Sequence, residues 1–144
     1  MSFRKTVPVA AVTTAATTVL GTISLGAPYG KVHGFYARNW ASSAKAAAGT
    51  DALQKVKLTD AHGTVFFLDA VDRAYHTAEV VLLIEYDDVL TGLGFLAVTG
   101  TGAAWVATEG QSLSPPVVQS PITVEVQNAG TATDYFEVYL LVEV

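Results

Sequence analysis

The chain contains no cysteine and is short of charge. Without cysteine it forms neither a disulfide framework nor a thiolate metal site, although this absence leaves the cellular compartment open. Charged residues make up 15% of the 144 residues and hydrophobic residues 51%, whereas an average soluble protein has about 25% charged residues. A soluble monomer needs a charged surface without large apolar patches. We therefore expect other chains to cover part of this surface.

Basic residues are absent from the second half of the chain. All eight Lys and Arg lie in residues 1–73 with four acidic residues, a net charge of +4, whereas residues 74–144 hold nine acidic residues, a net charge of −9. The basic residues stand singly and form no cluster, so we expect no binding to nucleic acid. Two interpretations stay open. Either the basic half faces the acidic half of its own or a neighbouring subunit, or the distribution has no role.

Long hydrophobic runs are also missing, since none reaches the roughly 18 apolar residues of a transmembrane helix. We expect no membrane partner. Residues 7–26, "VPVAAVTTAATTVLGTISLG", follow the basic start "MSFRK" and have the position of a secretory signal. Pro8 and repeated threonines interrupt this segment. Because Thr and Val favour extended backbone, we predict that it belongs to the working molecule as a strand or an arm.

The common catalytic motifs are not found: the sequence has no G-x-S-x-G, Walker loop, H-E-x-x-H or G-x-G-x-x-G. Asp69, Asp72 and His76 would lie near one face of a helix, where their oxygen and nitrogen atoms suit a divalent cation. Their spacing matches no established metal site, and a solvated connection explains them more simply. We therefore expect no enzyme, no cofactor and no metal.

The clearest pattern that is present is the alternation of strands near the C-terminus. Apolar residues alternate with polar ones over 122–127 and again over 135–144, on either side of the turn-prone "NAGTATD". We predict two antiparallel strands joined by a loop. The continuous apolar run 78–86 predicts a strand buried on both faces.

Several further strands follow from the same reasoning. Residues 54–60 and 64–70 flank "AHG" and predict a hairpin, with His62 as a solvated turn residue. Residues 29–40 predict another strand, and 94–100 and 103–109 predict two short ones. The prolines of "SLSPPVVQSPI" predict an extended connection with limited pairing, and alanine-rich residues 40–53 alone favour a helix.

Together these segments predict an all-β protein. Short strands at regular spacing are typical of an antiparallel β-sandwich or a jelly-roll-like barrel. A chain of 144 residues is long enough to bury one core. We predict an extended N-terminal arm or first strand over residues 1–30, and a single β-sandwich domain over residues 31–144.

Aromatic side chains are the main candidates for recognition, because they combine a large apolar area with a polar tip. Tyr135 and Tyr139 share one strand face with Glu137, so we expect them to be partly exposed or at a subunit contact. Core packing is the ordinary alternative. Our candidate interface residues are Arg4, Lys5, Val12, Val19, Trp40, Trp105, Tyr135 and Tyr139.

The chain resembles the small β-sandwich decoration or cement proteins of tailed-virus (bacteriophage) capsids. The resemblance lies in the Thr/Ala-rich N-terminal segment, in "LTDAHGTVFFLDA" and in the closing "ITVEVQNAGTATDYFEVYLLVEV". It implies a structural virion protein on the outer surface of an icosahedral head, which stabilises contacts between major capsid subunits. The implied partners are a major capsid protein and the chain itself, as a homotrimer or other homo-oligomer.

Two other functions stay open. A carbohydrate-binding β-sandwich would use aromatic side chains such as Trp105 and Trp40 to stack on sugar rings. A hydrolase on a jelly-roll barrel would use Asp69, Asp72 and His76 as metal ligands. Native mass in solution separates the first interpretation from these two, because only capsid decoration requires an assembly.

Overall fold

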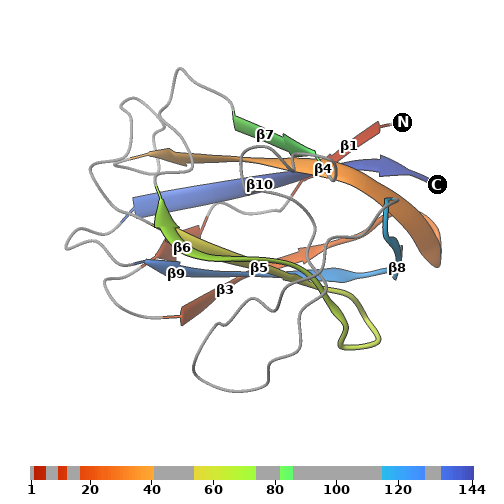
Figure 1. Ribbon diagram of the computed structural model, residues 1–144, viewed down its shortest axis with the longest axis horizontal. Helices are drawn as coiled ribbons and strands as arrows, with labels where there is room; N and C mark the ends of the chain where they lie inside the picture. The colour runs from red at the N-terminus through yellow and green to blue at the C-terminus, as the bar shows by residue number, and fades with distance from the viewer. Residues whose placement is uncertain are drawn as a thin grey trace.

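The architecture is that of an antiparallel β-sandwich. The computed structural model describes residues 2–5, 10–12, 17–40, 54–73, 82–85, 115–128 and 134–144. These residues form two layered sheets and contain no helix (Figure 1). The predicted all-β sandwich is confirmed, whereas the barrel alternative is not, because the described strands form two separate sheets.

The first sheet has six strands, and the strands of its main path form the upper layer of Figure 1. The order of the main path is β1 (Ser2–Lys5), β10 (Asp134–Glu143), β4 (Tyr29–Trp40) and β7 (Leu82–Glu85). Two short strands join this path, β2 (Ala10–Val12) beside β10 and β8 (Val117–Gln119) beside β4. Its long central strand β4 has the bounds predicted from the sequence, residues 29–40.

The second sheet has four strands, in the order β3 (Thr17–Ile23), β9 (Ile122–Asn128), β5 (Gln54–Thr59) and β6 (Val65–Arg73). The β5–β6 pair confirms the predicted hairpin. Its turn ends at Gly63, whose φ of +85° lies in the left-handed region that favours glycine. His62 is an exposed residue of this turn, as predicted.

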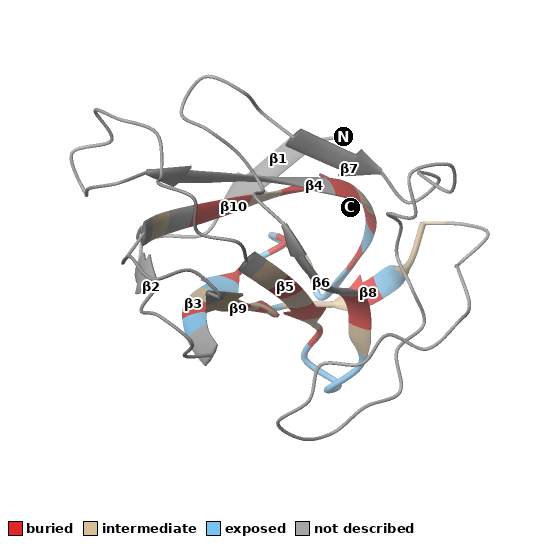
Figure 2. Cartoon of the chain, turned by 60° about the vertical axis from the view of Figure 1, so that its left-hand side comes forward, coloured by how far each residue is buried: buried red, intermediate tan, exposed pale blue. Residues whose placement is uncertain are grey.

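The core fills the space between the two sheets. Along β5 and β9, and along β10 from Val138 onwards, every second side chain is buried, as Figure 2 shows by alternating red bands. Buried aliphatic side chains of β10 face those of β5 and β9 across the sandwich. The core residues with no measurable exposure are Leu25, Val32, Val56, Leu58, Ile122, Val124, Val126, Val138, Leu140 and Val142.

The two C-terminal strands exist as predicted, but their predicted pairing is wrong. β9 pairs with β3 and β5, whereas β10 pairs with β1, β2 and β4. The chain therefore changes sheets between Asn128 and Asp134. Alternation within a strand sets which side chains face the core, but it does not choose the neighbouring strand.

The described part of residues 1–30 belongs to the sandwich. β1 and β2 pair with β10, and β3 pairs with β9. Leu20, Ile23 and Leu25 are buried in the core, with exposed fractions of 4%, 1% and 0%. The described residues of this segment thus form strands of the sandwich.

The helical arrangement considered for Asp69, Asp72 and His76 does not hold for the two carboxylates. Asp69 and Asp72 lie in β6, a strand, so the helical face that would gather them does not form. His76 lies outside the described residues, as do residues 41–53 of the helix-favouring stretch and the two short strands predicted over 94–100 and 103–109. β7 confirms a strand within the apolar run 78–86.

Candidate functional site

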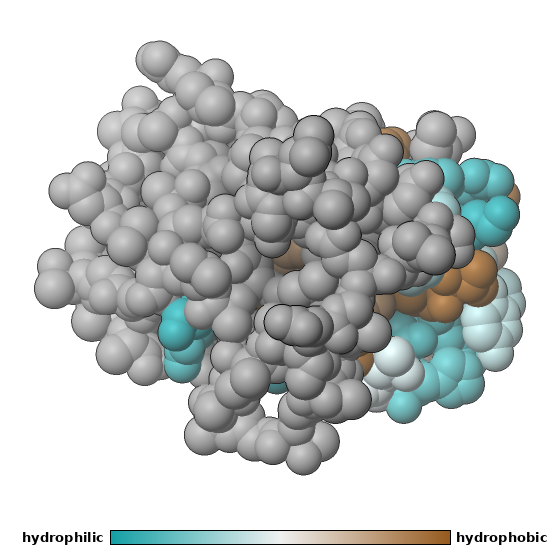
Figure 3. All heavy atoms as spheres, viewed as in Figure 1, coloured by the Kyte–Doolittle hydropathy of each residue, from teal (hydrophilic) through white to brown (hydrophobic). Residues whose placement is uncertain are grey.

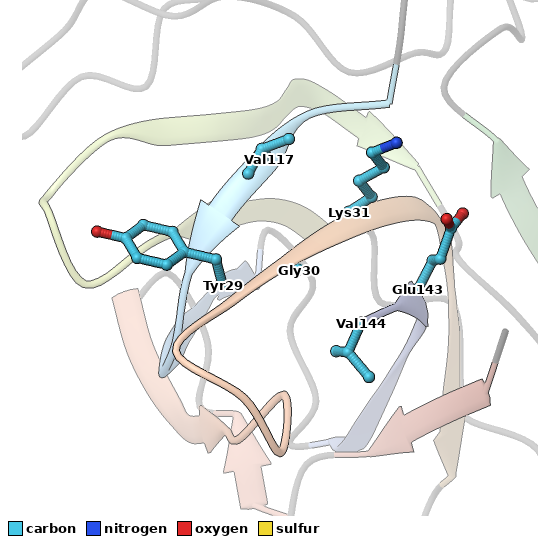
Figure 4. Close-up of a pocket in the computed structure, with 6 residues that line it drawn as sticks. All are labelled: Tyr29, Gly30, Lys31, Val117, Glu143 and Val144. Atoms are coloured by element: carbon cyan, nitrogen blue, oxygen red, sulfur yellow. The ribbon is translucent and has the colours of Figure 1, made fainter.

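One end of the sandwich carries an apolar hollow with charged side chains beside it. The hollow has a volume of about 230 Å³ and lies where β4 begins and β10 ends, beside β8 (Figure 4). We call this surface the end surface. Its lining residues are Tyr29, Gly30, Lys31, Val117, Glu143 and Val144.

Strand register brings these residues together from distant parts of the sequence. Lys31 on β4 is the direct partner of Val117 on β8 and of Glu143 on β10. Paired residues in adjacent antiparallel strands point to the same side of a sheet. Val117, Lys31 and Glu143 therefore form one row across three strands. Tyr29 lies two residues before Lys31 and shares its face.

The apolar members of the end surface are open to solvent. The exposed fractions are 52% for Tyr29, 64% for Val117 and 65% for Val144. In Figure 3 hydrophobic residues, in brown, gather at this right-hand end between hydrophilic residues, in teal. Single exposed apolar residues are common, but a group around a hollow indicates a binding surface.

Gly30 shapes the floor of the hollow. A Cβ atom on this residue would lie 3.2 Å from one methyl carbon each of Leu25, Val142 and Val144. Any side chain there would press on all three neighbours, because 3.2 Å is closer than normal carbon packing. Glycine therefore allows Val144 to lie close against the backbone of β4.

Asp60 anchors the turn that supports the end surface. Its side chain is only 8% exposed. Oδ1 accepts hydrogen bonds from the backbone N–H groups of His62 and Thr64, both at 3.0 Å, and Oδ2 accepts one from Gln119 N–H at 3.2 Å. Charged acceptors make the stronger hydrogen bonds. The β5–β6 turn is thereby fastened to β8.

Backbone hydrogen bonds connect β8 to the segment before β4. Ser120 N–H donates to Pro28 O at 2.9 Å, and Val32 N–H donates to Pro116 O at 3.0 Å. Leu25 N–H donates to the Ser120 hydroxyl at 3.1 Å. The "PPVVQSP" connection, residues 115–121, thus keeps its backbone paired despite three prolines, and it holds Tyr29 and Val117 in fixed relative positions.

The β5–β6 turn also places an aromatic side chain beside Tyr29. The ring of His62 lies with its centroid 6.2 Å from that of Tyr29, at an interplanar angle of 34°. This distance is within the range of interacting aromatic rings. His62 thus has more than the solvating role predicted for it, because its ring limits how the exposed tyrosine can turn.

Glu143 is held by a histidine at an irregular point of the β4–β10 ladder. The register shifts between Leu141 and Val142, which pair with Gly34 and Val32, so His33 is the extra residue of a β-bulge. Its Nε2–H donates to Glu143 Oε2 at 2.8 Å. This hydrogen bond and, after it, the charge of Lys31 lower the pKa of the Glu143 carboxyl below its ordinary value.

Lys31 is the available cation of the end surface. Within the described ranges it has no salt bridge, whereas Lys57 on the second sheet binds Glu125 at 3.2 Å. In Figure 4 the side chains of Lys31 and Glu143 rise from neighbouring strands towards the same side. One positive and one negative group therefore stand beside the apolar hollow.

The predicted interface residues are only partly gathered. The backbone register sets Lys5 opposite Tyr139, Arg4 opposite Leu140 and Trp40 opposite Tyr135, with β2, which ends at Val12, beside the start of β10. Val19 stands apart on β3 and is 57% exposed. Trp105 lies outside the described residues.

The face of β10 that carries the two tyrosines is more covered than predicted. Tyr135 and Tyr139 are half-buried and Glu137 is only 1% exposed. The Tyr139 hydroxyl donates a hydrogen bond to Glu137 Oε1. The tyrosines are partly exposed as expected, but the carboxylate between them is not a surface group.

The end surface was missed as a site in the sequence. Two signals point to it. The alternation in "YGKVH" places Tyr29 and Lys31 on the outer face of a strand. The prolines beside Val117 predict a short edge strand rather than a central one.

No family model, curated protein or solved structure matches this chain. Among the residues that the structure describes, no three His, Asp or Glu side chains gather as metal ligands. No helix in the same part of the chain is long and apolar enough to cross a membrane. The end surface is therefore interpreted from its own geometry.

Proposed function

We propose that this chain is a structural protein that works by contact with other protein subunits, as a decoration protein on the outside of a tailed-virus capsid. The observation that carries the proposal is the group of exposed apolar side chains, Tyr29, Val117 and Val144, around one hollow. The low charge content of the chain, 15%, supports it, because a surface with few charges gains from being covered.

The construction of the end surface suits a protein contact. Interfaces depend on a few aromatic or aliphatic anchors in well-packed places, and tyrosine is among the most frequent. Rigid anchors bind more tightly because less conformational entropy is lost. The buried carboxylate of Asp60 and the backbone bonds to Pro28 and Pro116 provide that rigidity here.

A β-sandwich that decorates a shell needs no catalytic centre. Its function is to bury surface across junctions between capsid subunits and so stabilise the assembled state by mass action. Many copies on one shell multiply a modest contact energy. We thus propose that the protein has this role on the virion and that its partner there is a major capsid protein.

Carbohydrate binding is the second candidate, and Tyr29 rather than Trp40 or Trp105 is the residue that favours it. A half-exposed ring beside Lys31 and Glu143 offers a stacking face and polar groups for sugar hydroxyls. The aliphatic walls made by Val117 and Val144 favour a protein side chain instead, because they offer no hydrogen bonds to a sugar.

Co-sedimentation with heads tests the proposal. Purified protein is mixed with tailed-virus heads from the same source that have been stripped of accessory proteins, and bound protein is measured in the pellet. We expect saturable binding, weakened at least about tenfold in a Tyr29→Ala/Val117→Ala double variant. Absence of binding by the folded wild-type protein would overturn capsid decoration. A glycan-array signal lost in Tyr29→Ala would favour the second candidate.

A further inference from the structure

We propose that the partner of the end surface is a second copy of this chain, bound about a twofold axis that pairs Lys31 of each copy with Glu143 of the other. The inference rests on the proposed function only in taking the end surface as a protein contact. It names a second copy as the partner at that surface, so that the Tyr29→Ala/Val117→Ala variant weakens head binding through loss of the paired copies rather than through direct contact with the capsid.

The charges of the end surface are self-complementary. A surface of one sign fits a partner of the opposite sign, whereas Lys31 and Glu143 are direct neighbours of opposite sign on β4 and β10. In a twofold contact the same patch serves both copies. An axis that lies in the contact plane and runs between these two strands places each lysine opposite the other copy's glutamate.

The apolar residues obey the same symmetry. Tyr29 lies on the β4 side of such an axis and Val144 on the β10 side. The operation that exchanges Lys31 and Glu143 therefore places the tyrosine of each copy over the β10 side of the other, where Val144 lies against the core-facing side of Gly30. Both side chains are more than half exposed in the single chain, and the hollow lies between them.

The local charges of the end surface lessen the repulsion between two copies that meet there. Two chains of formal charge −5 repel each other. Salt screens charges more than about 8 Å apart, so the groups at the contact itself matter most. Lys31 cancels Glu143 locally, and His33 holds the glutamate in one position by a hydrogen bond of 2.8 Å.

Charge reversal and native mass test the inference. The wild-type protein is expected to sediment with twice the 15.1 kDa mass of one chain. Lys31→Glu sets glutamates against glutamates across the axis, and Glu143→Lys sets lysines against lysines. Each variant alone should dimerise at least about tenfold more weakly, because like charges in contact are costly.

The decisive sample is an equimolar mixture of the two variants. In a mixed dimer both cross-axis pairs become opposite in sign, so the dimer is expected to return. Mixing does not change the charges within either chain, so restoration arises only from contacts between chains. The matched control is another cross-strand pair of opposite charge, Lys57 and Glu125 on the second sheet. Lys57→Glu and Glu125→Lys, alone or mixed, should leave the dimer mass unchanged.

Other outcomes overturn the inference, and they differ from those that overturn capsid decoration. The end surface is not a twofold contact if the wild-type protein is a monomer or a trimer, or if it is a dimer that neither Lys31→Glu nor Glu143→Lys weakens. If such a protein still binds heads through Tyr29 and Val117, the proposed function stands with the capsid as partner. A charge-dependent dimer that does not bind heads keeps the inference and removes the proposed function. Circular dichroism confirms that each variant is folded.

Discussion

Val117 and Val118 are consecutive residues of β8, yet the first is 64% exposed and the second 3% exposed. The strand directs one valine into the core and the other to the end surface. The two residues thus offer the same chemistry in opposite surroundings. Substitutions at the two positions therefore distinguish a contribution to folding from a contribution to assembly.

Alanine substitutions at these two positions should affect different properties, the stability of the fold at Val118 and self-association at Val117. Val118→Ala is expected to lower the free energy of unfolding by about 1–3 kcal/mol, because it removes buried methyl groups and leaves a cavity. Val117→Ala should change it by less than about 0.5 kcal/mol but weaken self-association. Urea denaturation measures the first quantity and analytical ultracentrifugation the second. A loss of stability in both variants, with no change in association, would contradict the role of Val117.

Asp60→Ala should destabilise the fold although it removes no apolar contact. The substitution leaves the backbone N–H groups of His62, Thr64 and Gln119 without their carboxylate acceptor. We expect a loss of about 2–3 kcal/mol in urea denaturation. Asp60→Asn, which keeps one acceptor oxygen, should lose less. An unchanged midpoint in Asp60→Ala would mean that the turn is not held to β8 in this way.

His33→Ala should raise the pKa of Glu143 towards its ordinary value, because the hydrogen bond from His33 is the largest cause of its lowering. Lys31→Met should raise it less. Carbon-13 NMR of the side-chain carboxyl during an acid titration measures both shifts. An equal pKa in wild type and His33→Ala would show that the hydrogen bond does not form in solution.

The lowered pKa of Glu143 also sets the sign of a pH effect on stability. A carboxyl that ionises more readily when folded stabilises the fold above its unfolded pKa of about 4.3. This contribution is lost as the pH falls through the lowered folded value. The difference in stability between wild type and His33→Ala should therefore shrink on acidification, and a constant difference would contradict it.

Deleting residues 1–26 should abolish folding rather than only docking. The deletion removes β1, β2 and β3, together with the buried side chains of Leu20, Ile23 and Leu25. We expect no cooperative thermal transition for the truncated chain. Val19→Ala, at an exposed position of the same segment, serves as the control and should unfold like wild type. A cooperative transition in the truncated chain would restore the arm interpretation.

Local patterns in the sequence were sufficient to predict several strands but not which strands pair with each other. The alternation of residues 122–127 and 135–144 and the "AHG" turn depend on neighbours in sequence, and the structure contains those strands and that hairpin. Five residues separate β9 from β10, a length that suits a hairpin as well as a change of sheet. Only the packing of the whole chain decides between these two connections.

The end surface could not be assembled from the sequence for the same reason. Tyr29, Asp60, Val117 and Glu143 come from four separate segments and meet only through cross-strand register and turn hydrogen bonds. The burial of Glu137 is a second example. Alternation places it correctly on the outer face of β10, but says nothing about what covers that face.

Hydroxyl-radical footprinting tests the central claim, that the end surface is a protein contact. Side-chain oxidation is measured by mass spectrometry in concentrated, assembled protein and in dilute protein. The account predicts that oxidation of Tyr29, Val117 and Val144 falls on assembly, while that of Val19, similarly exposed on the other sheet, does not. Unchanged oxidation at the end surface, with protection appearing at Val19 or elsewhere, would contradict the account.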